Sequence, residues 1–415
     1  MLSRISVVLA AIAIPFLPPD ILAAQFVYWG IGLALAALVL GMAADGRTFR
    51  ISKSALVSLA FLVLLYLWVL FRTQYNYRPI FGIFLGSAIG LISLTCLAVV
   101  FSSQYRVRLF LRIFVCACVI LTVSGIATDV LGALSIAVTY ARFPTQDPFV
   151  AQIYLPFSPT VGTLAVSGVD VVRLVGFGRE PGWMALFCSV AWFVNPFRGG
   201  LGRVVKGLLL IGVLLPISTA GFTIFVIMAI ADWIWIRARW SPDPVLRAVR
   251  SIVGLVILGA AFGFALFGPV LGFANKSELN AESLQQRGQA TATGISALGH
   301  FSLGGPSEST VPNVNLMASV AENGWPILLL GSLVVLGPLF SAASARESFA
   351  PTVSIFLTIL LAQPILDSAF ALALVLAVCQ LPRRDNPRGV RPFHTRPRAP
   401  SKVVVDNNGG WRGNT

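Results

Sequence analysis

Charged residues are scarce in this sequence. They make up 11% of its 415 residues, whereas hydrophobic residues make up 57%, and the mean hydropathy is +0.85. An ordinary soluble domain carries about 25% charged residues. This composition therefore excludes a soluble globular domain and predicts a chain that crosses a membrane many times.

Residues that commonly bind metals are also few, with five cysteines and two histidines. All five cysteines lie in apolar segments, and the chain has no Cys-x-x-Cys pair, no His-Glu-x-x-His motif and no Asp-x-Asp motif. Such cysteines are typical of small buried hydrophobic side chains. We therefore expect neither a metal nor a cofactor.

Twelve apolar segments are candidates for membrane-spanning helices. A span normally takes about 20 residues, so the first candidate and the last two are short. The pattern predicts an all-α integral membrane protein with one polytopic domain over residues 1–381. The spans are expected at about residues 5–18, 22–42, 54–71, 79–101, 108–131, 182–196, 204–219, 221–237, 251–272, 325–344, 351–363 and 366–381.

Two of the connecting loops are long, at about residues 132–181 and 273–324. Loops of this length are usually functional or disordered, and the aromatic residues and prolines of the first predict an ordered segment. After residue 381 the chain is rich in proline, arginine, glycine and asparagine. We expect residues 382–415 to form a disordered basic tail, and its arginines favour contact with anionic membrane lipid.

The positive charges predict which side of the membrane each loop faces, because lysine and arginine accumulate in cytoplasmic loops. With the N-terminus in the cytoplasm, 23 of the 30 lysine and arginine residues fall on the cytoplasmic side and 7 on the outer side. Both long loops then face outward and the tail faces inward. The net charge of +14 is therefore mainly a topology signal and does not indicate nucleic-acid binding.

Three arginines in the long outer loops, Arg173, Arg179 and Arg287, are candidates for binding an anion. A guanidinium group is planar, suits phosphate oxygens and stays charged. Gly176 lies between the first two and would let backbone N–H groups approach the same anion. The alternative is that these arginines only form ion pairs with carboxylates such as Glu180.

Several blocks of the sequence resemble the O-antigen and exopolysaccharide polymerases of the Wzy type, and the related O-antigen ligases. The first block is Arg-x-x-Gly-x-x-x-Glu-Pro at residues 173–181, opening an outer-side helix, and a Ser/Thr/Gly turn follows at 217–221. Arg287 and the small-residue run at 295–305 resemble the family's second arginine block. Residues 313–324 resemble the block that leads into a later span. The blocks share the family's order and membrane placement over about residues 20–380.

This resemblance implies a C-type glycosyltransferase fold in the bacterial cytoplasmic membrane, with the active site on the periplasmic side. The substrate would be an oligosaccharide linked to undecaprenyl diphosphate, and the arginines would hold the diphosphate. The implied reaction is an inverting, metal-independent polymerisation of lipid-linked repeat units. A chain-length regulator and a flippase are the implied protein partners.

Two alternative functions stay open at the level of sequence. One is an O-antigen-type ligase, which transfers the glycan to another acceptor. The other belongs to a different class, a flippase or transporter of lipid-linked oligosaccharides. A transporter typically shows internal repeats and charged or broken helices near the middle of the membrane, whereas this chain places its ionisable residues in two outer loops.

One position departs from the family pattern. Asn313 stands where ligases use a histidine as a base, and an asparagine cannot accept the proton, so we expect Asn313 only to bind substrate. Glu180 is then the first candidate for the base, because its carboxylate lies beside the arginines. His300, the only histidine outside the tail, is the second candidate. The departure favours a polymerase over a ligase.

Overall fold

In the computed structural model, the chain forms two units, Met1–Pro382 and Arg383–Thr415. The second unit lies outside the described residues, so the disordered basic tail stays a prediction. The described residues are 1–17, 23–45, 51–75, 80–134, 136–144, 150–154, 157–166, 169–176, 178, 180–237, 245, 249, 252–257, 259–260, 263, 281–304, 314–340, 345–364 and 369–381.

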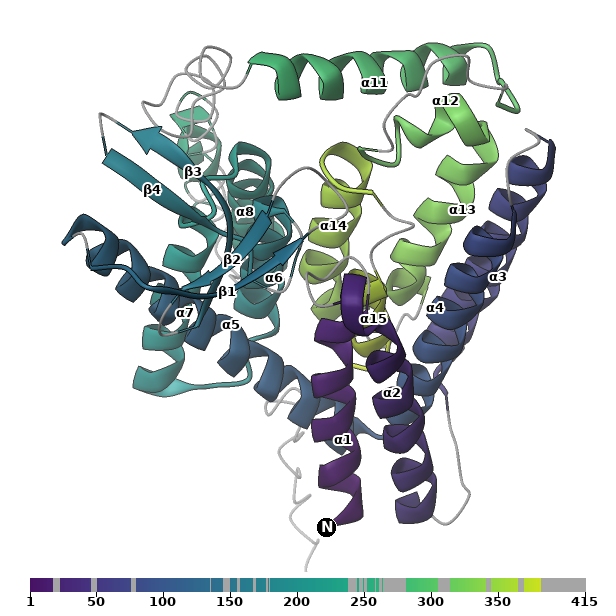
Figure 1. Ribbon diagram of the computed structural model, residues 1–415, viewed down its shortest axis with the longest axis horizontal. Helices are drawn as coiled ribbons and strands as arrows, with labels where there is room; N and C mark the ends of the chain where they lie inside the picture. The colour runs from purple at the N-terminus through teal and green to yellow at the C-terminus, as the bar shows by residue number, and fades with distance from the viewer. Residues whose placement is uncertain are drawn as a thin grey trace, which may run out of the picture. The chain divides into compact units, whose positions relative to one another are not determined.

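The first unit is mostly helical (Figure 1). Short 3₁₀ turns extend α1 at Ile14–Phe16 and α13 at Gly337–Phe340, and a π-helical turn extends α8 at Asp232–Arg237. The helices are α1 (Leu2–Ala13), α2 (Ala23–Asp45), α3 (Lys53–Tyr75), α4 (Ile80–Val100), α5 (Gln104–Ala133), α6 (Pro181–Val194), α7 (Gly199–Leu214), α8 (Thr219–Ala231), α11 (Ala281–Gly299), α12 (Ser319–Asn323), α13 (Trp325–Leu336), α14 (Ala345–Leu361) and α15 (Ala369–Cys379).

Four of these helices are long and apolar enough to cross a membrane. Their apolar stretches are Phe26–Ala44, Lys53–Gln74, Phe81–Val100 and Gln104–Ala133, which match the second to fifth predicted spans. Shorter apolar helices accompany them, among them α6 and α15. These helices are those of a membrane-embedded protein. The count of twelve spans stays a prediction, and most of the expected span at residues 251–272 lies outside the described residues.

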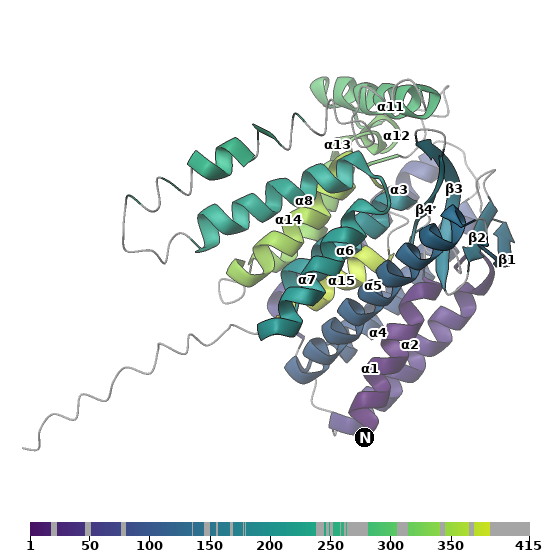
Figure 2. The ribbon, with the colours of Figure 1, turned by 90° about the vertical axis from the view of Figure 1, so that its left-hand side faces the viewer.

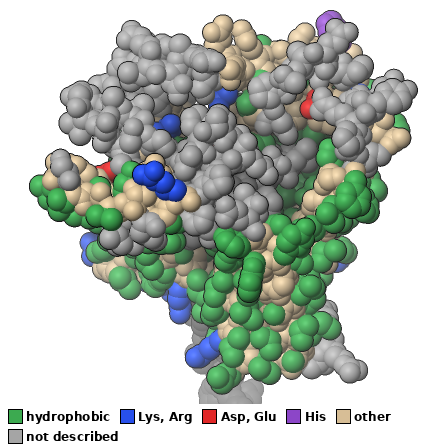
Figure 3. All heavy atoms as spheres, viewed as in Figure 1, with side chains coloured by type: hydrophobic (Ala, Val, Ile, Leu, Met, Phe, Trp, Pro, Cys, Tyr) green, Lys and Arg blue, Asp and Glu red, His purple; other side chains and the backbone are tan. Residues whose placement is uncertain are grey.

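The surface of the long helices is apolar, as expected for a lipid-facing surface. Hydrophobic side chains crowd the face over α1, α2 and α3 (Figure 3). Large apolar side chains that would be buried in a soluble protein are exposed on these helices and on α4, including Trp29, Val39, Leu67 and Phe81. Since lipid tails are as apolar as these side chains, no hydrophobic penalty opposes their exposure in a bilayer.

The core lies around α15, which is buried along its whole length. An entirely apolar helix without a polar face is typical of a segment that other helices surround on every side. The ring of Phe370 in α15 lies 4.2 Å from that of Phe187 in α6 and 6.0 Å from that of Phe114 in α5. Helices α5, α6 and α7 lie side by side, and α14 packs against α6 and α8 (Figure 2).

The first long loop contains a four-stranded antiparallel sheet, so the prediction of an all-α protein is wrong for this segment. The strands follow one another in chain order as β1 (Thr139–Pro144), β2 (Val150–Tyr154), β3 (Ser158–Val166) and β4 (Val169–Leu174). Half of the residues of β4 are valines, and β-branched residues favour pleated backbone over helix. The loop was predicted to be ordered, and the ordered structure is a meander.

A cluster of buried hydroxyl groups fixes the sheet to the end of α5. Ser158, at the start of β3, lies 2.8 Å from the hydroxyl of Ser124 and accepts a hydrogen bond of 2.8 Å from Thr128. The backbone N–H of Phe157 donates to Ser124 over 2.8 Å. Close by, an added Cβ at Gly125 would lie 3.0 Å from Leu174 of β4. These contacts fix the end of β4 beside α5, and this end of β4 leads into α6.

Replacing Ser158 by alanine tests this anchor. The hydroxyls of Ser124 and Thr128 would each lose a buried partner, which typically costs about 1–3 kcal/mol. We expect Ser158→Ala to lower the thermal unfolding midpoint of the detergent-purified protein. Ser296→Ala, at an exposed position of α11, is the matched control and should leave the midpoint unchanged. Equal midpoints for both variants would contradict the anchoring role.

Candidate functional site

The turn between β4 and α6 carries the conspicuous Arg-to-Glu-Pro motif. Arg173 lies in β4, and Gly176 then adopts a positive φ of 61°. Gly176 is buried, and a Cβ there would collide with the Met184 side chain. Only glycine fits this position, so backbone conformation and packing alone explain Gly176 without a ligand.

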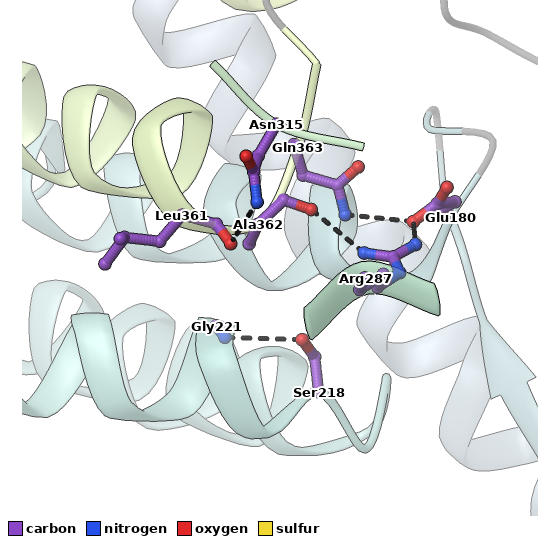
Figure 4. A network of polar contacts seen from close by, with 8 residues as sticks. All are labelled: Glu180, Ser218, Gly221, Arg287, Asn315, Leu361, Ala362 and Gln363. Atoms are coloured by element: carbon purple, nitrogen blue, oxygen red, sulfur yellow. Dashed lines mark hydrogen bonds and ion pairs between the residues drawn. The ribbon is translucent and has the colours of Figure 1, made fainter. Parts of the chain in front are cut away.

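Glu180 is the residue that precedes the first turn of α6, and Pro181 follows as the first helical residue. Proline is favoured there because its missing N–H would be unpaired anyway. The Glu180 side chain does not cap its own helix. Its carboxylate points instead toward side chains that arrive from α11 and from the end of α14 (Figure 4).

The centre of the site is an ion pair between Arg287 of α11 and Glu180. The Nη2 of Arg287 lies 2.5 Å from Oε2 of Glu180, and the two side chains are 38% and 30% exposed. Gln363 donates a hydrogen bond of 3.2 Å from Nε2 to the same carboxylate oxygen. Oε1 of Glu180 makes no hydrogen bond to the described residues. The pair is thus half-buried, with one carboxylate oxygen held twice.

Arg287 also binds the end of α14, where it donates from Nη1 to the carbonyl of Ala362 over 3.0 Å. The last carbonyls of a helix have no partner within it and carry partial negative charge. Here Asn315 donates to Leu361 O over 3.1 Å, and the N–H of Leu316 donates to Ile359 O over 2.9 Å. Side chains and backbone of the second long loop therefore cap α14.

Helix α11 holds Arg287 in place by close contact with the segment before α12. Gly294 is buried, and a Cβ there would collide with the carbonyl of Met317. Asn315 donates to the hydroxyl of Thr291 over 2.9 Å, and this hydroxyl donates to the carbonyl of Arg287 over 2.8 Å. Arg287, Thr291 and Gly294 are spaced so that they lie on one face of α11.

Arg173 acts electrostatically on the same pair. Burial lowers the pKa of the Arg173 guanidinium, while the charge of Glu180 raises it and the charge of Arg287 lowers it. Arginine remains charged despite such a shift, because the ordinary pKa of its guanidinium group lies far above neutral pH. Nε of Arg173 is buried without a hydrogen-bond partner in the part of the chain that the structure describes. A net positive charge therefore remains among these three side chains.

The turn between α7 and α8 adjoins the start of α6. Ile217 has a positive φ of 51°, which is unusual for a β-branched residue and marks local strain. Ser218 caps α8 by accepting a hydrogen bond of 3.3 Å from the N–H of Gly221. An added Cβ at Gly182 would lie 3.6 Å from the Ser218 hydroxyl. The N-termini of α6 and α8, both partially positive, thus lie near each other.

The structure brings together three of the predicted site residues, Arg173, Glu180 and Arg287, and separates another. His300 is exposed just beyond the end of α11. It lies 13 positions after Arg287, which corresponds to about 20 Å along a helix. His300 is therefore not beside the Glu180 carboxylate. Arg179 and Asn313, also expected at the site, lie outside the described residues.

Two polar residues that sequence reasoning did not select take part in the site. Gln363 is 2% exposed and binds Glu180, and Asn315 is 2% exposed and links α11 to α14. A signal existed for Gln363, because a glutamine followed by Pro364 interrupts two apolar segments. A buried amide in such a place needs partners, and a charged site nearby can supply them.

Comparisons with known proteins add nothing to this picture: no family model matches the chain, and no curated protein matches it. Within the described ranges there is no group of three or more histidine, cysteine, aspartate or glutamate residues that could hold a metal ion. The site is therefore defined by its own geometry, two arginines around one carboxylate at the meeting point of four chain segments.

Paired glycine substitutions in α11 test how Arg287 is held. Gly294→Ala would force α11 away from Met317, and overpacking of this kind typically costs about 1–3 kcal/mol. Gly288 faces open space, so Gly288→Ala should be neutral or slightly stabilising. In hydrogen–deuterium exchange, we expect faster exchange of α11 and of residues 315–318 only for Gly294→Ala. Identical exchange in the two variants would contradict this docking mode.

Proposed function

We propose that this chain is a membrane-embedded glycosyltransferase that polymerises polysaccharide repeat units carried on undecaprenyl diphosphate. One observation carries the proposal: Arg173, Glu180 and Arg287 converge from two long loops in a chain that is otherwise poor in charge. The same three residues belong to the sequence blocks that resemble Wzy-type polymerases. The resemblance selected these residues from the sequence alone, and their convergence in the structure supports the proposed function.

The chemistry of the site suits a diphosphate. Two guanidinium groups and two helix N-termini supply positive charge and N–H donors, which is the arrangement that binds phosphate oxygens. Arg287 and Glu180 are each about one-third exposed, so a headgroup at the membrane surface can reach them. The incoming anion would share Arg287 with Glu180, or displace it. Arginine then stabilises the charge of the departing diphosphate without a metal.

The reaction forms a glycosidic bond, breaks the bond to the diphosphate and transfers one proton. A hydroxyl oxygen of the acceptor sugar attacks the anomeric carbon of the donor, and the bond from that carbon to the diphosphate oxygen breaks. The electron pair of the broken bond leaves with undecaprenyl diphosphate, and the hydroxyl proton passes to Glu180. Attack opposite the leaving group inverts the anomeric centre. Glu180 can accept the proton because its Oε1 has no partner among the described residues.

The proposed side of action is the periplasmic face of the bacterial cytoplasmic membrane. The 23-to-7 distribution of lysine and arginine supports an outward orientation of both loops that build the site. Asn313, in place of the ligase histidine, favours a polymerase over a ligase. A site built from two outer loops also favours an enzyme over a transporter, whose substrate site lies near the middle of the membrane.

Removing either arginine tests the diphosphate site. Loss of one preorganised charge-stabilising donor typically costs about 100-fold or more in rate. We expect cells carrying Arg173→Ala or Arg287→Ala to lack long-chain polysaccharide and to accumulate single lipid-linked repeats. Arg142→Ala, which removes an exposed arginine of β1, should give the wild-type ladder. A wild-type ladder from Arg173→Ala or Arg287→Ala would refute the proposal.

Replacing Glu180 by glutamine tests the base. The shape of the side chain is kept, but the proton acceptor is lost, which typically lowers the rate about 10²–10⁴-fold. We expect this loss in the initial rate of chain extension by protein reconstituted in liposomes. Glu347→Gln, near the start of α14, is the control and should keep the rate. If Glu180→Gln polymerises at the wild-type rate, Glu180 is not the base.

A further inference from the structure

We infer that Gln363 is a positioning residue that orients the Glu180 carboxylate for proton transfer. The inference rests on the proposed function, in which Glu180 is the base, and it adds a residue that none of the sequence blocks contains. Gln363 binds the Glu180 carboxylate and packs against Gly182 in the first turn of α6. Its proposed effect on the reaction therefore passes through Glu180.

The first argument is the burial of an amide where packing alone would favour an apolar side chain. Gln363 is 2% exposed, and its Oε1 is buried without a partner in the part of the chain that the structure describes. Burying an unpaired polar atom is unfavourable. The other end of the amide, Nε2, donates to Oε2 of Glu180 over 3.2 Å. The hydrogen bond to Glu180 is the contact that explains a glutamine at this position.

The second argument is the fit of Gly182 against the same amide. A Cβ at Gly182 would collide with Nε2 of Gln363. Gly182 lies in the first turn of α6, two residues after Glu180. A glycine in a helix is unfavourable compared with alanine, so its presence here needs a reason. The absent side chain leaves the space that the Gln363 amide occupies when it reaches Glu180.

The third argument is that both hydrogen bonds to the Glu180 carboxylate go to the same oxygen. Arg287 and Gln363 both bind Oε2, and neither binds Oε1. Donors from α11 and from the segment just after α14 hold Oε2, which leaves Oε1 to face a substrate hydroxyl. Among the described residues, the charged groups that face Glu180 are Arg287 from α11 and Arg173 from β4. Gln363 is neutral, so it orients the carboxylate without adding charge.

The C-terminus of α14 makes this arrangement rigid. Ala362 and Gln363 directly follow α14, and both of their N–H groups donate to Thr358 O, over 2.8 and 2.9 Å. The carbonyl of Ala362 holds Arg287 while the side chain of Gln363 holds Glu180. One helix end therefore aligns both members of the ion pair.

The test uses the purified full-length protein in liposomes with lipid-linked repeat units as substrate. Gln363→Met keeps the volume of the side chain but removes the donor. We expect kcat to fall at least tenfold, with KM for the lipid-linked repeat changed less than threefold, after normalisation to the folded fraction from size-exclusion chromatography. Gln289→Met, at an exposed position of α11, is the control and should match wild type.

A second variant separates positioning from a purely structural role. Gly182→Ala displaces the Gln363 amide without changing Gln363, so it should lower kcat in the same way. Gln363→Met and Gly182→Ala both remove the hydrogen bond from Gln363 to Glu180. The double variant should therefore be no slower than the slower single variant. Gly207→Ala, a glycine of α7 with open space around it, controls for the substitution itself. If Gln363→Met does not fold, Gly182→Ala alone carries the kcat and KM comparison.

Three results would overturn the inference. One is a kcat within twofold of wild type in Gln363→Met and in Gly182→Ala. Another is a rise in KM at constant kcat, which would make Gln363 a binding residue. The third is a double variant whose losses multiply. A wild-type protein that does not extend lipid-linked repeats would instead refute the proposed function, so the two failures are distinguishable.

Discussion

The candidate site depends on the ion pair between Arg287 and Glu180. These residues are 107 positions apart, and their contact joins the second long loop to the start of α6. A half-buried pair of charges is stronger than an exposed one because less water screens it. The end of α14 supplies a carbonyl to the cation and an amide to the anion. Each charge therefore has a second partner, which keeps the pair in one geometry.

Close approach of the backbone makes this pair possible. Gly294 lets α11 rest on the carbonyl of Met317, Gly182 leaves room for the Gln363 amide, and Gly176 turns the chain from β4 toward α6 against Met184. In or near lipid an isolated charge is energetically costly, so a charged side chain in this protein needs a partner of opposite charge close by. The glycines bring three separate elements near enough for the charges to compensate one another.

The sequence predicted the four long helices α2 to α5, because continuous apolar runs of their length are typical of membrane-spanning helices. It also selected Arg173, Glu180 and Arg287, since charges are conspicuous in an apolar chain. It did not predict the sheet. The prediction of an ordered loop rested on its aromatic residues and prolines, whereas the β-branched residues between 139 and 174 carry the strand signal. Gln363 was missed because the sequence does not show which group a single amide at the end of a span binds.

The most direct test of glycosyl transfer is to identify the products that the purified protein makes in liposomes from lipid-linked repeat units alone. If the site transfers glycan as proposed, lipid-linked dimers and longer chains will form, and free undecaprenyl diphosphate will be released in equal number to the new glycosidic bonds. Recovery of unchanged single repeats, or their mere redistribution across the bilayer, would contradict glycosyl transfer as the function of this site.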